Sequence, residues 1–157
     1  MLYRTIFFLC FLTPSWLFSQ ISESNGLYFD KNKQPYSGTY IEYYTSGTKK
    51  IEIPLSEGKK NGKVVLYFEN GNVNEYRSYV QNLMDGIWET FNIQNIKIAE
   101  ASYKNNLKHG KWFIWDDKGT KRYEMEYHEG KKVGKWYIWD ENGALQSEKD
   151  FGPASQE

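Results

Sequence analysis

The sequence predicts an all-β protein: an elongated, twisted antiparallel sheet of about five consecutive β-hairpin repeats. Three observations predict this fold: a 24-residue period, two turn sites in every period, and alternation of apolar with polar residues between the turns. The period is set by a recurring glycine, found at Gly38, Gly62, Gly86, Gly110 and Gly134. A phrase repeated at fixed spacing indicates a structural unit copied along the chain.

The first strand of each unit follows its starting glycine and is marked by aromatic residues. Two positions after the glycine stands an apolar residue that is usually aromatic, namely Tyr40, Val64, Trp88, Trp112 and Trp136. Five positions after it stands an aromatic residue in every unit, namely Tyr43, Tyr67, Phe91, Trp115 and Trp139. Runs of about seven residues that are rich in Tyr, Trp, Ile and Val have the length and composition of ordinary strands.

Two turn sites divide each unit, and both are always glycine or asparagine. The first closes the hairpin, at Gly47, Gly71, Asn95, Gly119 and Gly143. The second leads into the next unit, at Gly58, Asn82, Asn106 and Gly130. Asparagine tolerates a positive φ better than most residues that carry a side chain, so its appearance here preserves the turn.

The second strand of each unit alternates with a period of two. Tyr123, Met125 and Tyr127 alternate with Glu124 and Glu126, which is the pattern of a strand and not of a helix. One acidic position recurs, at Glu52, Glu100, Glu124 and Glu148. We expect these glutamates to form a solvated face, paired across strands with Lys63, Lys111 and Lys135.

No metal or other cofactor is expected. Equivalent carboxylates of successive hairpins lie about 10 Å apart, which is too far to share one ion. His109 and His128 are the only histidines, and we expect neither to act as a ligand or base. The sequence also has no Gly-x-Ser-x-Gly elbow and no phosphate-binding glycine loop, so we expect no enzyme activity.

The chain divides into four segments. Residues 1–19 are expected to be a signal peptide, with Arg4 followed by an apolar stretch shorter than the about 20 residues that span a bilayer. Residues 20–37 form a lead segment that would add a covering strand, 38–151 the five repeats, and 152–157 a tail. The only cysteine, Cys10, lies in the signal segment, so cleavage would leave none. We therefore expect export to the periplasm, the cell envelope or the medium; the alternative is a segment retained as an anchor.

The phrase YKNNLKHGKWFIWDDKG, residues 103–119, and its counterpart Tyr127-x-x-Gly130-Lys-x-x-Gly134-x-Trp136 resemble the variant MORN repeat of the YwqK-like toxin-antitoxin system antitoxin family. The resemblance covers about residues 36–151. It implies a twisted sheet of successive hairpins and, for function, an antitoxin. Val64, Asn82, Asn95 and Asn106 depart from the pattern of rings and glycines.

Both faces of the first strands are apolar, which leaves two interpretations open. In one, the sheet curls into a half-tube, so that one set of rings becomes a core and long side chains cover the other. In the other, Tyr43, Tyr67, Phe91, Trp115 and Trp139 form an exposed stripe that binds a peptide, a glycan or another protein.

The predicted function is that of an exported, non-catalytic protein-binding or scaffold module whose partner is another protein, with a glycan as an alternative. A second hypothesis is an antitoxin or immunity protein that neutralises a toxin, and a third is a lipid-binding or glycan-binding module. Lys plus Arg is 20 and Asp plus Glu is 20. Because this balance creates no net positive field, neither nucleic-acid binding nor recognition of anionic membranes is expected.

Overall fold

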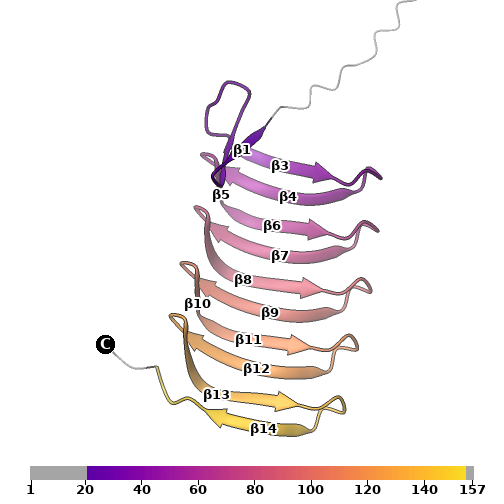
Figure 1. The fold of residues 1–157 in the computed structure, drawn as a ribbon, viewed down its shortest axis with the longest axis vertical. Coiled ribbons are helices and arrows are strands. Elements are labelled where there is room, and N and C mark those ends of the chain that lie inside the picture. Colours follow the sequence, from indigo (N-terminus) through magenta and orange to yellow (C-terminus); the bar gives the residue numbers. More distant parts are fainter. Residues whose placement is uncertain (1–20, 155–157) are drawn as a thin grey trace, which may run out of the picture.

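The computed structural model describes residues 21–154, and there the chain forms one long antiparallel sheet (Figure 1). The predicted fold class is confirmed. The first strands of the five units are β3 (Gly38–Tyr43), β6 (Gly62–Tyr67), β8 (Leu83–Phe91), β11 (Gly110–Trp115) and β13 (Lys131–Trp139). The second strands are β4 (Lys49–Ser56), β7 (Val73–Val80), β9 (Lys97–Lys104), β12 (Lys121–His128) and β14 (Leu145–Asp150).

Strand order in the sheet follows chain order from β3 to β14. The short strands β5 (Lys59–Lys60) and β10 (Leu107–Lys108) pair with β4 and β9 just before the next unit begins. Register repeats with the sequence: Gly38 lies opposite Leu55, Gly62 opposite Tyr79, and Gly110 opposite Tyr127. Neighbouring units therefore present equivalent residues side by side.

The hairpin turns share one hydrogen-bond pattern, which explains the turn residues. In the fourth unit the Asp116 N–H donates to the Thr120 carbonyl and the Gly119 N–H donates to the Asp116 carbonyl, each at 2.9 Å. The Asp116 carboxylate also accepts the N–H groups of Lys118 and Thr120. Asn95 occupies the glycine position of the third turn with φ of 64°, so the substitution keeps the geometry.

At the second turn site, asparagine adds a hydrogen bond that glycine cannot make. The N–H of Asn82 donates to the Lys60 carbonyl, and its Oδ1 accepts the Lys60 N–H at 2.7 Å. Asn106 repeats both bonds with Met84, again at 2.7 Å through Oδ1. The asparagines therefore tie the second unit to the first and the third unit to the second.

Tryptophans stabilise the junctions between units. Register shifts occur between Arg77 and Tyr79 on β7 and between Glu124 and Glu126 on β12. The indole N–H of Trp88 donates to the Ser78 carbonyl at 3.0 Å, and that of Trp136 donates to the Glu126 carbonyl at 3.1 Å. Each indole thus satisfies a carbonyl group at the irregularity: that of the unpaired Ser78 on β7, and that of Glu126, the residue after the unpaired Met125, on β12.

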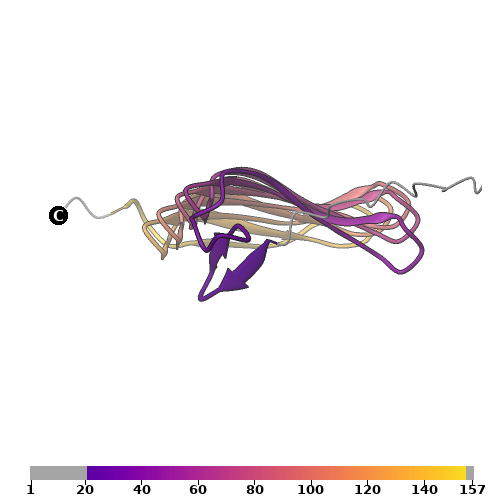
Figure 2. The same ribbon diagram turned by 90° about the horizontal axis from the view of Figure 1, so that it is seen from above.

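The lead segment does not add a strand to the long sheet, so that expectation was wrong. Its strands β1 (Ser22–Ser24) and β2 (Leu27–Phe29) form a separate hairpin, which Figure 2 shows projecting from one face of the sheet. Backbone bonds join Tyr28 and Tyr36 to Gly58. Tyr28 packs into a cluster with Ile53, Leu55 and Val64. Because Val64 and Leu55 are smaller than the rings at the same positions of other units, they leave room for Tyr28.

The sheet is a single layer, and the expectation of a half-tube with a ring core was wrong. Its two ends, β3 and β14, lie at opposite edges, and Figure 2 shows only a gentle curve. Among the described residues the buried hydrophobic side chains are few, namely Tyr28, Ile53, Leu55, Val64, Tyr127 and Val133. Most aromatic rings are half-buried.

The expected signal peptide, including Cys10, lies outside the described residues. Within residues 21–154 no helix is long and apolar enough to cross a membrane.

Candidate functional site

One face of the sheet, here called the ladder face, carries a continuous row of ring contacts. Successive ring centroids lie 4.8 to 5.5 Å apart along Tyr79, Trp88, Tyr103, Trp112, Tyr127, Trp136 and Phe151. The ammonium group of Lys108 lies 4.3 Å from the Trp112 centroid, and that of Lys132 lies 4.6 Å from the Trp136 centroid. These rings pack mainly on one another and on lysine side chains, so the ladder face holds the hairpins together.

The opposite face, here called the stripe face, carries the five rings singled out in the sequence. Trp115 contacts Phe113 with centroids 5.6 Å apart, and Trp139 contacts Tyr137 at the same distance. Phe91 meets Tyr76 edge to face, and the Tyr67 hydroxyl donates to Glu52. Tyr43 is exposed, whereas the other four rings are half-buried. The structure places these rings on one face, at the hairpin-turn ends of the first strands.

Lysines partly cover this stripe. The Lys97 ammonium lies 5.6 Å from the Trp115 centroid, and the Lys121 ammonium lies 5.1 Å from the Trp139 centroid. Each lysine belongs to the strand preceding the ring that it covers. The stripe face is therefore a mixed surface, on which flat rings alternate with fixed charges.

The recurring glutamates lie on the stripe face too, and the expectation that they form a solvated face was wrong for Glu124. Glu124 lies opposite Phe113 in the β11 pairing and opposite Tyr137 in the β13 pairing. Its side chain is only 17% exposed, because rings and lysines surround it. At the edge strand β14, Glu148 is 39% exposed because it has a strand neighbour on one side only.

Two of the three predicted lysine partners are confirmed. Lys111 bonds Glu124 at 2.8 Å, and Lys135 bonds Glu148 at 2.7 Å. The predicted pairing of Lys63 with a glutamate was wrong. Its ammonium lies 4.6 Å from the centroid of the Tyr76 ring, and Tyr76 takes the glutamate position in the second unit. A second lysine, Lys121, lies on the same strand as Glu124 and also bonds it, at 2.9 Å. Sequence reasoning missed this second partner, three residues before the glutamate.

The two lysines determine the acid behaviour of Glu124. Hydrogen bonds from Lys111 and then Lys121 outweigh the effect of burial and lower the pKa of this carboxyl below its ordinary value of 4.5. A carboxyl whose pKa is lower in the folded state stabilises the fold above pH 4.5 and loses that contribution as the pH falls through the lowered pKa.

Replacing Glu124 with glutamine should therefore lower the free energy of unfolding at pH 7 by about 0.5 to 1 kcal/mol, since both lysines are well exposed. As the pH falls below 4.5, the stability of the variant should also decline less than that of the wild type. Urea unfolding monitored at several pH values measures both effects. Glu148→Gln, at a more exposed glutamate that pairs with Lys135, is the matched control and should change less. An equal loss of stability for both variants at every pH would contradict the assignment.

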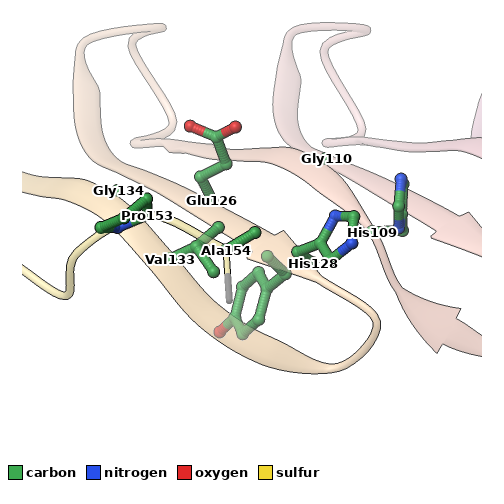
Figure 3. Close-up of a pocket in the computed structure, with 9 residues that line it drawn as sticks. His109, Gly110, Glu126, His128, Val133, Gly134, Pro153 and Ala154 are labelled. Carbon is green, nitrogen blue, oxygen red and sulfur yellow. The ribbon is translucent and has the colours of Figure 1, made fainter. Parts of the chain in front are cut away.

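The histidines adjoin each other, which was not anticipated. The centroids of His109 and His128 lie 4.8 Å apart, in a hollow of about 220 Å³ at the end of β12 (Figure 3). The pairing of Gly110 with Tyr127 was the signal for this contact, because it brings the flanking residues together. Nδ1 of His109 accepts the Glu129 N–H, and Figure 3 shows the Glu126 carboxylate directed away from the imidazoles. Within the described residues, no three His, Cys, Asp or Glu side chains gather as a metal site.

The comparisons with known proteins support the repeat. The family described as MORN repeat variant matches residues 60–81 and 132–151. The first match spans β6 and β7 and the second spans β13 and β14, so each covers one hairpin. Their starts lie 72 residues apart, which is three periods of 24 (132 minus 60). The comparison with curated proteins finds no match.

Proposed function

We propose that this chain is an exported, non-catalytic repeat protein that binds another protein through its stripe face. The observation that carries the proposal is the composition of that face: Tyr43, Tyr67, Phe91, Trp115 and Trp139 stand in one row, with lysines and glutamates between them and no second layer over the row in residues 21–154. Aromatic residues are enriched where proteins meet, whereas a soluble monomer seldom exposes a contiguous apolar surface.

The shape of the face favours a macromolecular partner over a small molecule. The hollow beside Trp139, lined by Lys121 and Gly143, measures about 210 Å³. Small-molecule sites are deeper, at about 300 to 1,000 Å³, and enclose most of their ligand. A flat row of rings with alternating charges instead fits a surface that contributes complementary charges along its length.

The partner would use the ion pairs for orientation and the rings for affinity. Lys97 bonds Glu89 and Glu100 at 3.1 and 2.7 Å while its ammonium lies over Trp115. A group that displaces such a lysine from the ring would uncover an apolar surface held at a fixed position. Rigid rings of this kind bind with little loss of conformational entropy.

The test is capture from an extract of the native envelope. Replacing Trp115 and Trp139 with alanine should weaken capture of the bound protein strongly, since tryptophans at an interface often contribute about 2 kcal/mol or more each. The captured protein is identified by mass spectrometry, purified, and titrated against the wild type and the variant. Circular dichroism must show that the β-sheet signal is kept.

Ile114 and Ile138 provide the matched control. They neighbour the two tryptophans in sequence but lie on the opposite face, and they are 39% and 37% exposed. Replacing both with serine should leave binding to the identified partner unchanged. If the isoleucine variant lost binding as much as the tryptophan variant, the stripe face would not be the binding surface.

An antitoxin or immunity role is the second candidate. The matches at residues 60–81 and 132–151 to a repeat variant agree with the repeat resemblance that suggested it. This role requires one defined partner, a toxin, and in the export hypothesis an exported one. Co-expression with the product of a neighbouring toxin-like gene should restore growth, and failure of the protein to restore growth would remove this candidate.

A further inference from the structure

We infer that copies of this chain associate head to tail, with strand β14 of one copy pairing with strand β3 of the next. The ends of the sheet are β3 and β14, and each has a strand neighbour on one side only. Strand β14 is the second strand of the last unit and β3 is the first strand of the first unit. The two free edges are therefore the two halves of the junction that joins successive units inside the chain.

The internal junctions define the register of this contact. Glu100 and Ala99 of β9 pair with Phe113 and Ile114 of β11. The other three junctions repeat the pairing at the same repeat positions, 24 residues apart. Transferred to the free edges, it places Glu148 opposite Ile41 of the next copy and Ser147 opposite Glu42.

The side chains at the two edges match in this register. On the stripe face, Lys97 covers Trp115 and Lys121 covers Trp139 across internal junctions. The equivalent residues at the ends are Leu145, 54% exposed, and Tyr43, 49% exposed. A leucine stands where the two preceding units have lysine, so this edge presents apolar surface that Tyr43 of a second copy would cover.

The ladder face would continue through the same contact. Within the chain Tyr103 meets Trp112 across the β9–β11 junction at 5.2 Å, and Tyr127 meets Trp136 across the β12–β13 junction at 5.1 Å. The equivalent pair at the ends is Phe151 with Tyr40 of the next copy. The lead hairpin packs through Tyr28 on Ile53, Leu55 and Val64 of β4 and β6, which lie on the inner side of β3.

Unpaired strand edges are where sheets add further strands, and proteins usually block them. The charge of Glu148 does not by itself block the β14 edge. The equivalent residues Glu52, Glu100 and Glu124 lie on internal strands that pair with a neighbour on both sides. A second copy is therefore a better partner for this edge than an unrelated strand, since it reproduces a junction that the sequence already forms.

Disulfide trapping in the full chain tests the register. With Cys10 replaced by serine, the only thiols are those introduced at Glu42 and Ser147. Oxidation of the E42C/S147C variant should give a ladder of linked copies on a non-reducing gel, with the 42–147 peptide pair identified by mass spectrometry. Mixing the E42C and S147C single variants should give dimers only, because each of these chains carries one reactive edge.

Two further variants provide the controls. A99C/I114C places thiols at the equivalent internal pair and should oxidise within one chain. T39C/S147C keeps the thiol on β3 but moves it out of register, and its ladder should be lost. A monomeric E42C/S147C beside an oxidised A99C/I114C would overturn the proposal, as would equal ladders for E42C/S147C and T39C/S147C. Dimers of S147C alone in equal yield would instead indicate pairing of β14 with β14.

Sedimentation of the Cys10→Ser chain gives an independent measurement. Its mean mass should rise with concentration, and replacing both Tyr43 and Leu145 with aspartate should abolish the rise, because like charges would then face each other at the junction. A constant monomer mass at the highest concentration, or association unaffected by the two aspartates, would contradict the head-to-tail contact.

Discussion

Replacing Trp112 with alanine is expected to lower the free energy of unfolding by about 3 kcal/mol, one of the largest effects of any single ring. The indole contacts Tyr103 at 5.2 Å and Tyr127 at 5.3 Å, and its N–H donates to the Ser102 carbonyl at 2.9 Å. The substitution therefore interrupts the ladder between two units. Urea unfolding monitored by circular dichroism measures the loss.

Trp115→Ala is the control for this prediction, since it removes the same side chain three residues away on the stripe face. Its ring contacts Phe113 and is covered by Lys97, each at 5.6 Å. We expect a loss of about 1 kcal/mol, because one ring contact and one cation–π contact are removed. Equal destabilisation by the two variants would show that the faces do not differ in the way described.

Replacing Gly58 with alanine is expected to lower the free energy of unfolding by about 2 to 4 kcal/mol, the second large effect. This glycine has φ of 77°, and an added Cβ would lie 2.9 Å from the Tyr28 carbonyl oxygen and 3.4 Å from Cβ of Pro35. Both atoms belong to the lead segment, so the methyl group would push it away from Val64. Hydrogen exchange at Tyr28 and Tyr36, whose N–H groups are bonded in the folded state, should become faster.

Gly47→Ala separates the effect of crowding from that of backbone strain. Gly47 has φ of 85°, but no atom lies within 4 Å of the position of its added Cβ. This variant should lower the free energy of unfolding by only about 1 to 2 kcal/mol, which is the cost of a left-handed conformation for a residue with a side chain. If both glycine variants lost the same stability, the lead segment would not be held at Gly58.

The repeat could be predicted in detail because its determinants are local. Glycine or asparagine at a turn reports on backbone conformation directly, and Asn82, Asn95 and Asn106 all adopt positive φ. Alternation along Tyr123 to Tyr127 likewise predicted a strand, and β12 covers those residues. The lysine partners of Glu124 and Glu148 followed from cross-strand pairing.

The use of the two faces could not be predicted, because alternation does not say which set of rings packs more closely. Trp112 and Trp115 are equally aromatic, and only the register shows that Trp112 meets a ring of each neighbouring strand, Tyr103 of the preceding unit and Tyr127 of its own unit. The glutamates were assigned to solvent on composition, whereas register places Glu124 between Phe113 and Tyr137. The lead hairpin was missed because Tyr28 reaches Val64 through a contact that lies outside the period.

Cross-strand nuclear Overhauser effects test the central claim most directly. If five copied hairpins lie side by side in one antiparallel sheet, contacts should link Ala99 with Ile114 and Tyr123 with Ile138, two equivalent pairs 24 residues apart. The account predicts cross-strand signals at both pairs and extended-strand signals along β9 and β12. Helical signals between Ala99 and Tyr127, or contacts that ignore the repeat register, would contradict it.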